Sequence, residues 1–271
     1  MQQLGLAFLT SATVSFLGYW RGSLSRSGVA GALIVGTLTF GLGGWAWGLL
    51  LGTFFVSSSL LSHFRESEKR RLAEKFDKGH RRDFGQAMAN GGVGATIALL
   101  NALKPSSVWF PFFVGVMSTV NADTWATELG TLSRRRPRLI TTGQVVDTGT
   151  SGGVSRLGTF VSLVGGGLIG LAAGVSNAGR HKWGRLALIG GCAGLAGSLF
   201  DSLLGATVQQ IYFCDRCQKE TERRNHKCGD VTRPLRGWPW LNNDLVNLIA
   251  SLVGGATAVA LWTFLRKRDD G

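Results

Sequence analysis

Two carboxylates and an amide lie close together where one long apolar segment of the chain ends. Asn121, Asp123 and Glu128 fall within about two helical turns. Thr124 would share a helix face with Asn121 and with Glu128, because residues three and four apart are neighbours on a helix. Oxygen ligands of this kind suit a hard cation such as Mg²⁺, held partly through water and a phosphate. The alternative is a helix end at the membrane interface whose acids are simply hydrated.

A third carboxylate, Asp201, lies well inside the apolar run 186–208. An unpaired carboxylate at membrane depth is costly, so Asp201 needs a cation, a proton or a polar partner. Asn243 and Asp244 stand where the last apolar run begins and are further candidates for binding a ligand. Capping of a helix N-terminus by Asn242 or Asn243 is the alternative.

A cluster of arginines and a glycine-rich turn follow the acidic segment. The residues are Arg134, Arg135, Arg136 and Arg138, then Thr150, Ser151, Gly152 and Gly153. A turn of this kind entering a helix can aim backbone N–H groups at a phosphate, and nearby arginines can bind the same oxygens bidentately. We therefore expect a phosphate-binding loop here, with a plain flexible connector as the alternative.

Four potential metal ligands lie close together in a polar segment before the last apolar run. They are Cys214, Cys217, His226 and Cys228. Two ligands on one tight turn and two on another can form a tetrahedral zinc site, and four protein ligands leave no open position for catalysis. The pattern predicts a structural Zn²⁺, and free thiols in a reducing compartment are the alternative.

The overall composition places the chain in a membrane. Hydrophobic residues make up 45% of the 271 residues and charged residues 17%, and the charges lie in the gaps between apolar blocks. The formal net charge is +13. A nucleic-acid-binding protein would gather its Lys and Arg on one groove-facing element. Bases that flank apolar runs instead favour anionic lipids or phosphorylated ligands, so we expect membrane partners and no nucleic acid.

The apolar runs predict the helices. A helix that crosses a membrane needs about 20 apolar residues. The candidate spans are 4–20, 29–61, 85–103, 108–129, 157–175, 186–208 and 245–264. The run 29–61 is too long for one pass and is broken by Gly41, Gly43 and Gly44, so it predicts two helices. The sequence thus predicts an all-α, polytopic transmembrane helix bundle of about seven to eight spans. Residues 1–271 form a single integral membrane domain, with a polar loop at 209–240 that holds a zinc knuckle before the last helix.

The loop charges predict an orientation. Interleaved acids and bases over 63–83 are typical of a solvated helix. Cytoplasmic loops are rich in Lys and Arg, which predicts that 63–84, 131–153 and 209–240 are cytoplasmic. Eight spans would put the basic residues 266–268 on the side opposite the cytoplasm, which contradicts the same rule. Seven spans, or one short re-entrant segment, would remove this conflict.

Five segments together resemble a known family of integral membrane proteins. They are N-A-D-T-W-A-T-E-L-G (121–130), P-R-L-I-T-T (137–142), G-T-S-G-G-V-S-x-L-G-T (149–159), G-S-L-F-D-S-L-L-G-A (197–206) and W-L-N-N-D-x-V-N (240–247). The family contains vertebrate transmembrane protein 19 and is catalogued as domain of unknown function 92. The resemblance covers nearly the whole chain.

The resemblance implies phosphoryl transfer. Relatives in plants and cyanobacteria include the phytyl-phosphate kinase of tocopherol synthesis, and the family is distantly similar to CTP-using polyprenol kinases. This implies a membrane-embedded kinase that moves a phosphoryl group from a nucleoside triphosphate, CTP or ATP, to an isoprenyl monophosphate such as phytyl or geranylgeranyl monophosphate. Asp123, Glu128 and Asp201 would hold Mg²⁺ or orient the acceptor phosphate. The arginines and the loop 149–155 would hold the nucleotide phosphates.

Other functions stay open at this point. The cysteine cluster has no tie to the kinase branch of the family, and the absence of a Walker A sequence excludes a P-loop mechanism. The alternatives are a cation-coupled transporter, in which Asp123, Glu128 and Asp201 line an ion path, and a lipid-binding membrane protein without turnover. The asymmetric loops and the lack of an obvious internal repeat weigh against a transporter.

Overall fold

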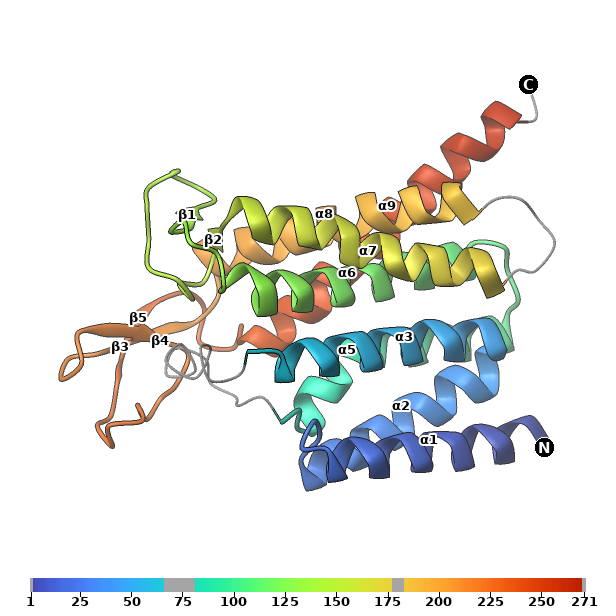
Figure 1. Ribbon diagram of the computed structural model, residues 1–271, viewed down its shortest axis with the longest axis horizontal. Coiled ribbons are helices and arrows are strands. Elements are labelled where there is room, and N and C mark those ends of the chain that lie inside the picture. The colour runs from blue at the N-terminus through green and yellow to red at the C-terminus, as the bar shows by residue number, and fades with distance from the viewer. Residues whose placement is uncertain (1, 66–80, 177–182, 270–271) are drawn as a thin grey trace.

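A bundle of long helices forms the body of the molecule. The computed structural model describes residues 2–65, 81–176 and 183–269, and within these ranges eight helices run back and forth along one axis (Figure 1). They are α1 (Gln2–Trp20), α2 (Arg26–Gly43), α3 (Trp45–His63), α5 (Phe84–Leu103), α6 (Trp109–Gly130), α7 (Arg156–Ser176), α8 (Trp183–Thr207) and α9 (Asn243–Asp269). The predicted helical bundle is confirmed. The solvated helix expected over 63–83 falls largely outside the described residues.

The long apolar run 29–61 divides into two helices at one glycine. Gly44 has φ 88°, a left-handed conformation that glycine adopts without steric cost. Its N–H donates to the Phe40 carbonyl (2.9 Å), which closes α2, and α3 begins at the next residue. Gly41, Gly43 and Gly44 therefore mark a reversal of the chain.

Two small antiparallel sheets lie at one end of the bundle, and both chain termini lie at the other (Figure 1). One sheet pairs β1 (Arg138–Leu139) with β2 (Gly153–Val154); the other has the order β4-β3-β5, from β3 (Ile211–Cys214), β4 (Lys219–Thr221) and β5 (Arg233–Arg236). The segment 209–240, expected to be a polar loop, is thus a folded sheet between α8 and α9. With eight helices, the basic residues Arg266 and Lys267 lie at the end opposite the sheets, where the charge rule did not expect them.

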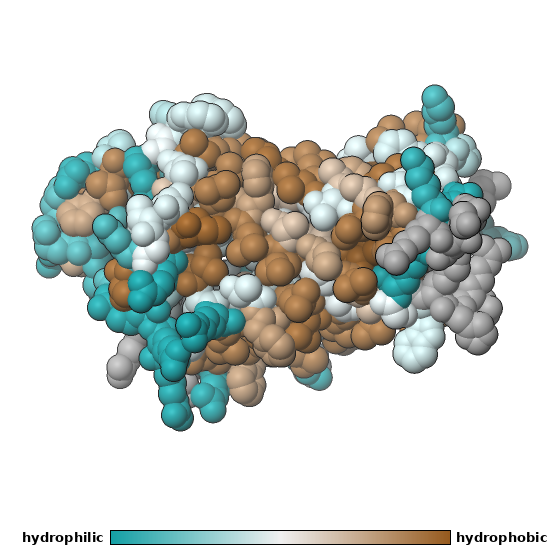
Figure 2. Space-filling model, turned by 90° about the horizontal axis from the view of Figure 1, so that it is seen from above, coloured by the Kyte–Doolittle hydropathy of each residue, from teal (hydrophilic) through white to brown (hydrophobic). Residues whose placement is uncertain are grey.

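The surface is that of an integral membrane protein. Figure 2 shows a hydrophobic band across the middle of the molecule, with hydrophilic residues gathered at its two ends. Within the described part of the chain, five helices, α2, α3, α7, α8 and α9, are long and apolar enough to cross a membrane. Exposed tryptophans mark both ends of the band: Trp20 and Trp240 at the sheet end, Trp45 and Trp183 at the other. Tryptophan is enriched at the two membrane–water interfaces, so these side chains match an aromatic belt.

Helix α6 occupies the centre of the bundle. It packs against α3, α5, α7, α8 and α9, and its residues from Phe113 to Ala122 are buried without interruption. Phe113 stacks on Trp47 of α3, with ring centroids 4.3 Å apart. Because neighbouring helices surround it, α6 can carry polar side chains that would be costly against lipid.

Glycines bring α7 and α8 into backbone contact. Gly166 and Gly170 on α7 face Gly190 and Gly194 on α8. A Cβ atom added at Gly170 would overlap the Leu186 carbonyl oxygen, and one added at Gly166 would overlap that of Gly190. Small residues at this spacing let membrane helices approach closely.

Replacing Gly170 by alanine should lower the free energy of unfolding by about 1–3 kcal/mol, because the new methyl group has no space. Gly167 on the same helix is the matched control, since a Cβ atom there would lie 3.7 Å from the Ala187 oxygen. Gly167→Ala should change the stability by less than about 0.5 kcal/mol. Both substitutions raise the helix propensity by the same amount. The difference between their free energies of unfolding therefore reports the contact between Gly170 and α8. Equal stability of the two variants, measured by SDS unfolding in mixed micelles, would contradict this packing.

Candidate active site

The polar residues of α6 face two different neighbours. Asn121 is fully buried; its Oδ1 accepts a hydrogen bond from Ser57 Oγ on α3 (2.9 Å) and its Nδ2 donates to the Gly165 carbonyl on α7 (2.7 Å). Trp125 Nε1 also donates to Ser57 Oγ (3.3 Å). Asn121, expected to bind substrate, therefore joins three helices.

Glu128 lies on the same face of α6 as Asn121. Its Oε1 accepts a hydrogen bond from Ser62 Oγ of α3 (2.7 Å). Burial lowers the pKa of Arg82 to about 10, and the charge of Glu128 opposes this decrease, so Arg82 stays cationic at neutral pH. Asp123 and Glu128 are five residues apart, which places them about 140° apart around the helix. The structure thus puts Glu128 against α3, whereas Asp123 faces α8.

Asp123 and Asp201 form an acidic pair between α6 and α8. Asp123 Oδ1 accepts a hydrogen bond from Ser198 Oγ of α8 (3.3 Å), and Ser198 in turn contacts Ser162 of α7 (3.3 Å between Oγ atoms). Asp201 follows Ser198 by one helical turn and interacts electrostatically with Asp123. Among the described residues, its Oδ2 atom is buried without a hydrogen-bond partner. The sequence predicted both carboxylates, and the structure brings them together.

A third carboxylate, Glu222, approaches this pair from the sheet. It follows β4 and interacts electrostatically with Asp201. Gln209 Nε2 donates to Glu222 Oε1 (2.9 Å), and Ser151 Oγ donates to Gln209 Oε1 (2.8 Å). Sequence reasoning missed Glu222 and Gln209, because Glu222 lies in the charged segment 218–225 and no spacing distinguishes it. Hydrogen bonds from Ser151 through Gln209 to Glu222 therefore connect the glycine-rich loop to the acidic pair.

The glycine-rich loop packs tightly on α8. Gly152 has φ 83°, and a Cβ atom there would lie 2.6 Å from the backbone nitrogen of Ala206. The Gly153 N–H donates to the Thr150 carbonyl (3.0 Å), and the Thr150 N–H donates to the Asp147 carbonyl (3.1 Å). These two amides therefore donate within the loop. The absence of a side chain at Gly152 lets the loop pack closely against α8.

The arginines of the same region make local contacts at the surface. Arg136 forms an ion pair with Asp147, and Arg138 Nη1 donates to the Gly143 carbonyl (2.7 Å). Arg134 and Arg135 are exposed. Arg138 also lines a recess of about 500 Å³, together with Ser155, Arg156 and apolar side chains of α7 and α8.

The start of α9 resolves the choice left open for its polar residues. Asn242 caps the helix, because its Oδ1 accepts a hydrogen bond from the Leu245 N–H (3.0 Å). Asn243 and Asp244 lie half-buried in the first turn, at the end of the bundle where the sheets lie. Capping thus falls to Asn242, and Asn243 and Asp244 begin the first turn of α9.

Four potential metal-ligand atoms converge at the end of β3 and in the connections between the strands of the three-stranded sheet. The sulfur atoms of Cys214, Cys217 and Cys228 and a ring nitrogen of His226 lie within 4.8 Å of one another. The Cys214 and Cys228 sulfurs are 3.7 Å apart, and His226 Nδ1 lies 3.2 Å from the Cys228 sulfur. Two sulfurs bound to one tetrahedral zinc at about 2.3 Å would lie about 3.8 Å apart. The geometry therefore fits a zinc ion.

The thiols of this cluster have different affinities for a proton. A hydrogen bond from the Asp230 backbone, followed by one from the His226 ring, lowers the pKa of Cys228 to about 7. Hydrogen bonding to the Cys228 sulfur, together with burial and the nearby Cys214 sulfur, raises the pKa of Cys217 to about 11. The Cys228 thiol therefore loses its proton at a lower pH than the Cys217 thiol does.

Comparison with known proteins agrees with the fold and the motifs. The family model for integral membrane protein DUF92 matches residues 9–255. The chain is 32% identical over 273 residues to Protein PGR of Arabidopsis thaliana, covering 93% of each chain. It is 32% identical over 244 residues to a membrane protein of Methanocaldococcus jannaschii, covering 89% of this chain and 87% of that one. It is 26% identical over 252 residues to Protein VTE6, chloroplastic, of Arabidopsis thaliana, covering 89% of this chain and 66% of that one. No solved structure matches the chain. The chain therefore belongs to the integral membrane protein family DUF92.

Proposed function

We propose that this protein is a membrane-embedded kinase that transfers a phosphoryl group from CTP or ATP to an isoprenyl monophosphate. The observation that supports this most directly is the acidic pair Asp123 and Asp201, which lies between membrane helices beside a loop rich in arginine and glycine. Phosphoryl transfer depends on positioning and charge neutralisation more than on covalent catalysis. The buried acidic pair would supply the charge neutralisation by holding a cation, and the arginines of the loop would bind phosphate oxygens.

The acidic pair fits a magnesium ion. Asp201 Oδ2 is buried without a hydrogen-bond partner among the described residues, and two further carboxylates, Asp123 and Glu222, act on it. Like charges that are buried together are costly unless a cation or protons neutralise them. Asp123 and Asp201 would hold Mg²⁺ through oxygen ligands, and the ion would neutralise phosphate charge. Ser198 fixes the Asp123 carboxylate, and Glu128 with Arg82 would orient the acceptor phosphate.

We also propose that Cys214, Cys217, His226 and Cys228 hold a structural Zn²⁺. The four ligands would leave no open coordination position, and they lie at the end of β3 and in the connections of the sheet that presents Glu222. Zinc would stabilise this sheet and, through Glu222 and Gln209, the side of the acidic pair that faces it.

The kinase proposal is tested by turnover of the purified protein in lipid nanodiscs. Incubation with Mg-CTP or Mg-ATP and geranylgeranyl or phytyl monophosphate should yield the isoprenyl diphosphate, detected by mass spectrometry. EDTA should abolish the product, because the carboxylates need a cation to neutralise the phosphates. Absence of product with every pair of substrates would refute the kinase. Cation uptake by liposomes that contain the protein would then favour the transporter.

A further inference from the structure

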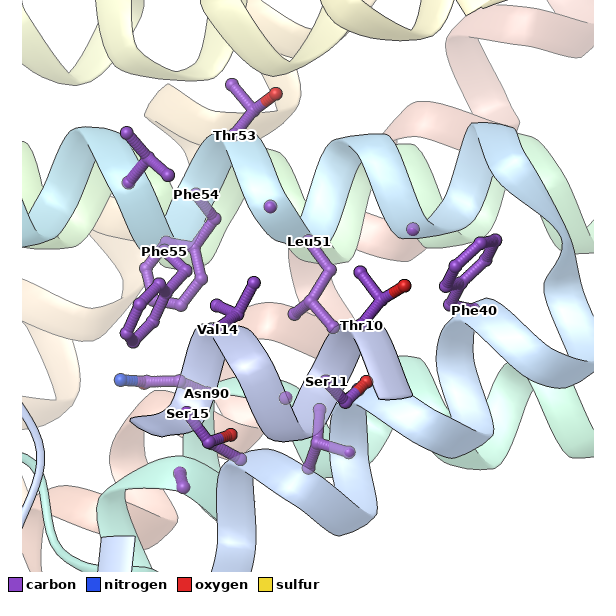
Figure 3. A pocket seen from close by; sticks show the side chains of 18 of the residues that line it. Thr10, Ser11, Val14, Ser15, Phe40, Leu51, Thr53, Phe54, Phe55 and Asn90 are labelled. Carbon is purple, nitrogen blue, oxygen red and sulfur yellow. The ribbon is translucent and has the colours of Figure 1, made fainter. Parts of the chain in front are cut away.

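A cavity of about 650 Å³ lies among α1, α2, α3 and α5 (Figure 3). Its walls are mostly apolar: Phe40 and Phe55 lie at opposite ends of the labelled side chains in Figure 3, with Leu51 and Val14 between them. The volume is in the range of ligand-binding cavities. Apart from Arg82, the residues assigned above to phosphoryl transfer do not line this cavity.

The cavity is elongated and opens toward lipid. It follows α3 from Gly48 to Leu60, a separation of about 18 Å at the rise of an α-helix. Leu49, Val56 and Leu60 line it and are also exposed on the hydrophobic band. A hydrocarbon chain could therefore enter from the bilayer and lie along α3, whereas a compact polar ligand would lack polar partners for most of this length.

One end of the cavity is polar and cationic. Arg82 lines this end, and the other described lining residues are uncharged. Its guanidinium lies 5.5 Å from the ring centroid of Phe54 and 5.9 Å from that of Phe55, and its Nη1 donates to Ser59 Oγ (3.2 Å). Asn90 lies at the same end, beside Phe55 in Figure 3. An apolar cavity with a cation at one end suits an amphiphile with an anionic head group.

The polar end of the cavity adjoins the helix that carries Asp123. Ser57 lines the cavity and donates to Asn121 of α6, and it accepts a hydrogen bond from Trp125 of the same helix. Arg82 also interacts electrostatically with Glu128 of α6. An anion held by Arg82 would therefore lie beside the last turns of α6.

We propose that this cavity binds the hydrocarbon chain of a single-chain isoprenyl monophosphate and that Arg82 binds its phosphate. The identity of this occupant rests on the proposed kinase function. The long apolar part of the cavity favours a hydrocarbon chain as the ligand. The Arg82 guanidinium favours an isoprenyl monophosphate over the corresponding free alcohol.

Gly52 allows the cavity to be filled without disturbing the fold. It lines the cavity, and a Cβ atom added there would meet no atom within 4 Å. Leucine at position 52 would therefore occupy the space of the ligand. Gly5 on α1 is the matched control, because a Cβ atom there also meets no atom within 4 Å and the residue lies outside the cavity.

The test is photolabelling of the whole protein in phosphatidylcholine nanodiscs. The probe is geranylgeranyl monophosphate with a diazirine at the far end of its chain, and the labelled peptides are identified by mass spectrometry. Labels are expected on α1, α2, α3 or α5. Gly52→Leu should reduce them about tenfold and Gly5→Leu should leave them unchanged, since only the first variant overfills the site.

Arg82→Gln tests the phosphate contact. It should weaken labelling by the monophosphate probe and leave labelling by the corresponding diazirine alcohol unchanged. Labels confined to the other helices, or a Gly52→Leu variant labelled like the unmodified protein, would overturn the proposal. A further control uses a phosphatidylcholine that carries a diazirine. If it labels the cavity and excess geranylgeranyl monophosphate does not displace it, the cavity holds bilayer lipid and the proposal is overturned.

Turnover is measured separately on the same preparations. Cavity labelling without turnover would support the lipid site and overturn the kinase. Turnover with labelling elsewhere would support the kinase and overturn the lipid site.

Discussion

Asp123→Asn is expected to reduce phosphoryl transfer by at least about 10²–10³-fold and to leave the protein folded. Asparagine has the size of aspartate and can still accept the hydrogen bond from Ser198 (3.3 Å in this structure). It removes the negative charge that would hold a cation beside Asp201. Initial rates with Mg-CTP and geranylgeranyl monophosphate measure the effect, and size-exclusion chromatography checks the fold.

Glu128→Gln is the matched control, because it removes a carboxylate from another face of the same helix, α6. Glu128 contacts Ser62 on α3, on a different face of α6 from Asp123. Its loss should therefore reduce the rate less than the loss of Asp123 and should act mainly on the KM for the lipid. Full activity of Asp123→Asn would remove the acidic pair from the mechanism. If Asp201→Asn lowers only the stability, its role is in packing.

About one zinc ion should copurify with each chain when the protein is prepared under reducing conditions, because four ligands converge within 4.8 Å. Cys214→Ala should lose the metal and lower the midpoint of thermal unfolding. Cys214 is buried at the end of β3, so its loss also removes a packed side chain from the sheet. Metal content is measured by mass spectrometry of the digested protein.

Cys192→Ala is the matched control for this change. Cys192 is also a free cysteine, but it lies in α8, outside the cluster. Its replacement should leave the zinc content unchanged. Freshly reduced protein without zinc, together with unchanged unfolding of Cys214→Ala, would mean that the cysteines are free thiols.

The helices of this protein follow from local properties of the sequence. Each predicted span is a helix whose ends differ from the prediction by a few residues, and the run 29–61 forms the two helices expected of it. Burial in lipid requires the backbone groups to be satisfied within each segment. The division at Gly44 was also predictable, since its positive φ is a property of the residue itself. The same holds for the convergence of Cys214, Cys217, His226 and Cys228, which lie within one short segment.

Tertiary structure decided which polar residues meet. Asp123 and Glu128 are close in sequence but point to different helices, because five residues along a helix turn a side chain about 140°. Asp123 instead meets Asp201, which α8 brings from far along the chain. Glu222 reaches Asp201 only because the sheet that follows α8 places it there, where Gln209 also donates a hydrogen bond to it. Apolar periodicity shows that a helix is buried, but the partner of each buried side chain depends on how whole helices pack, which is a property of the complete bundle.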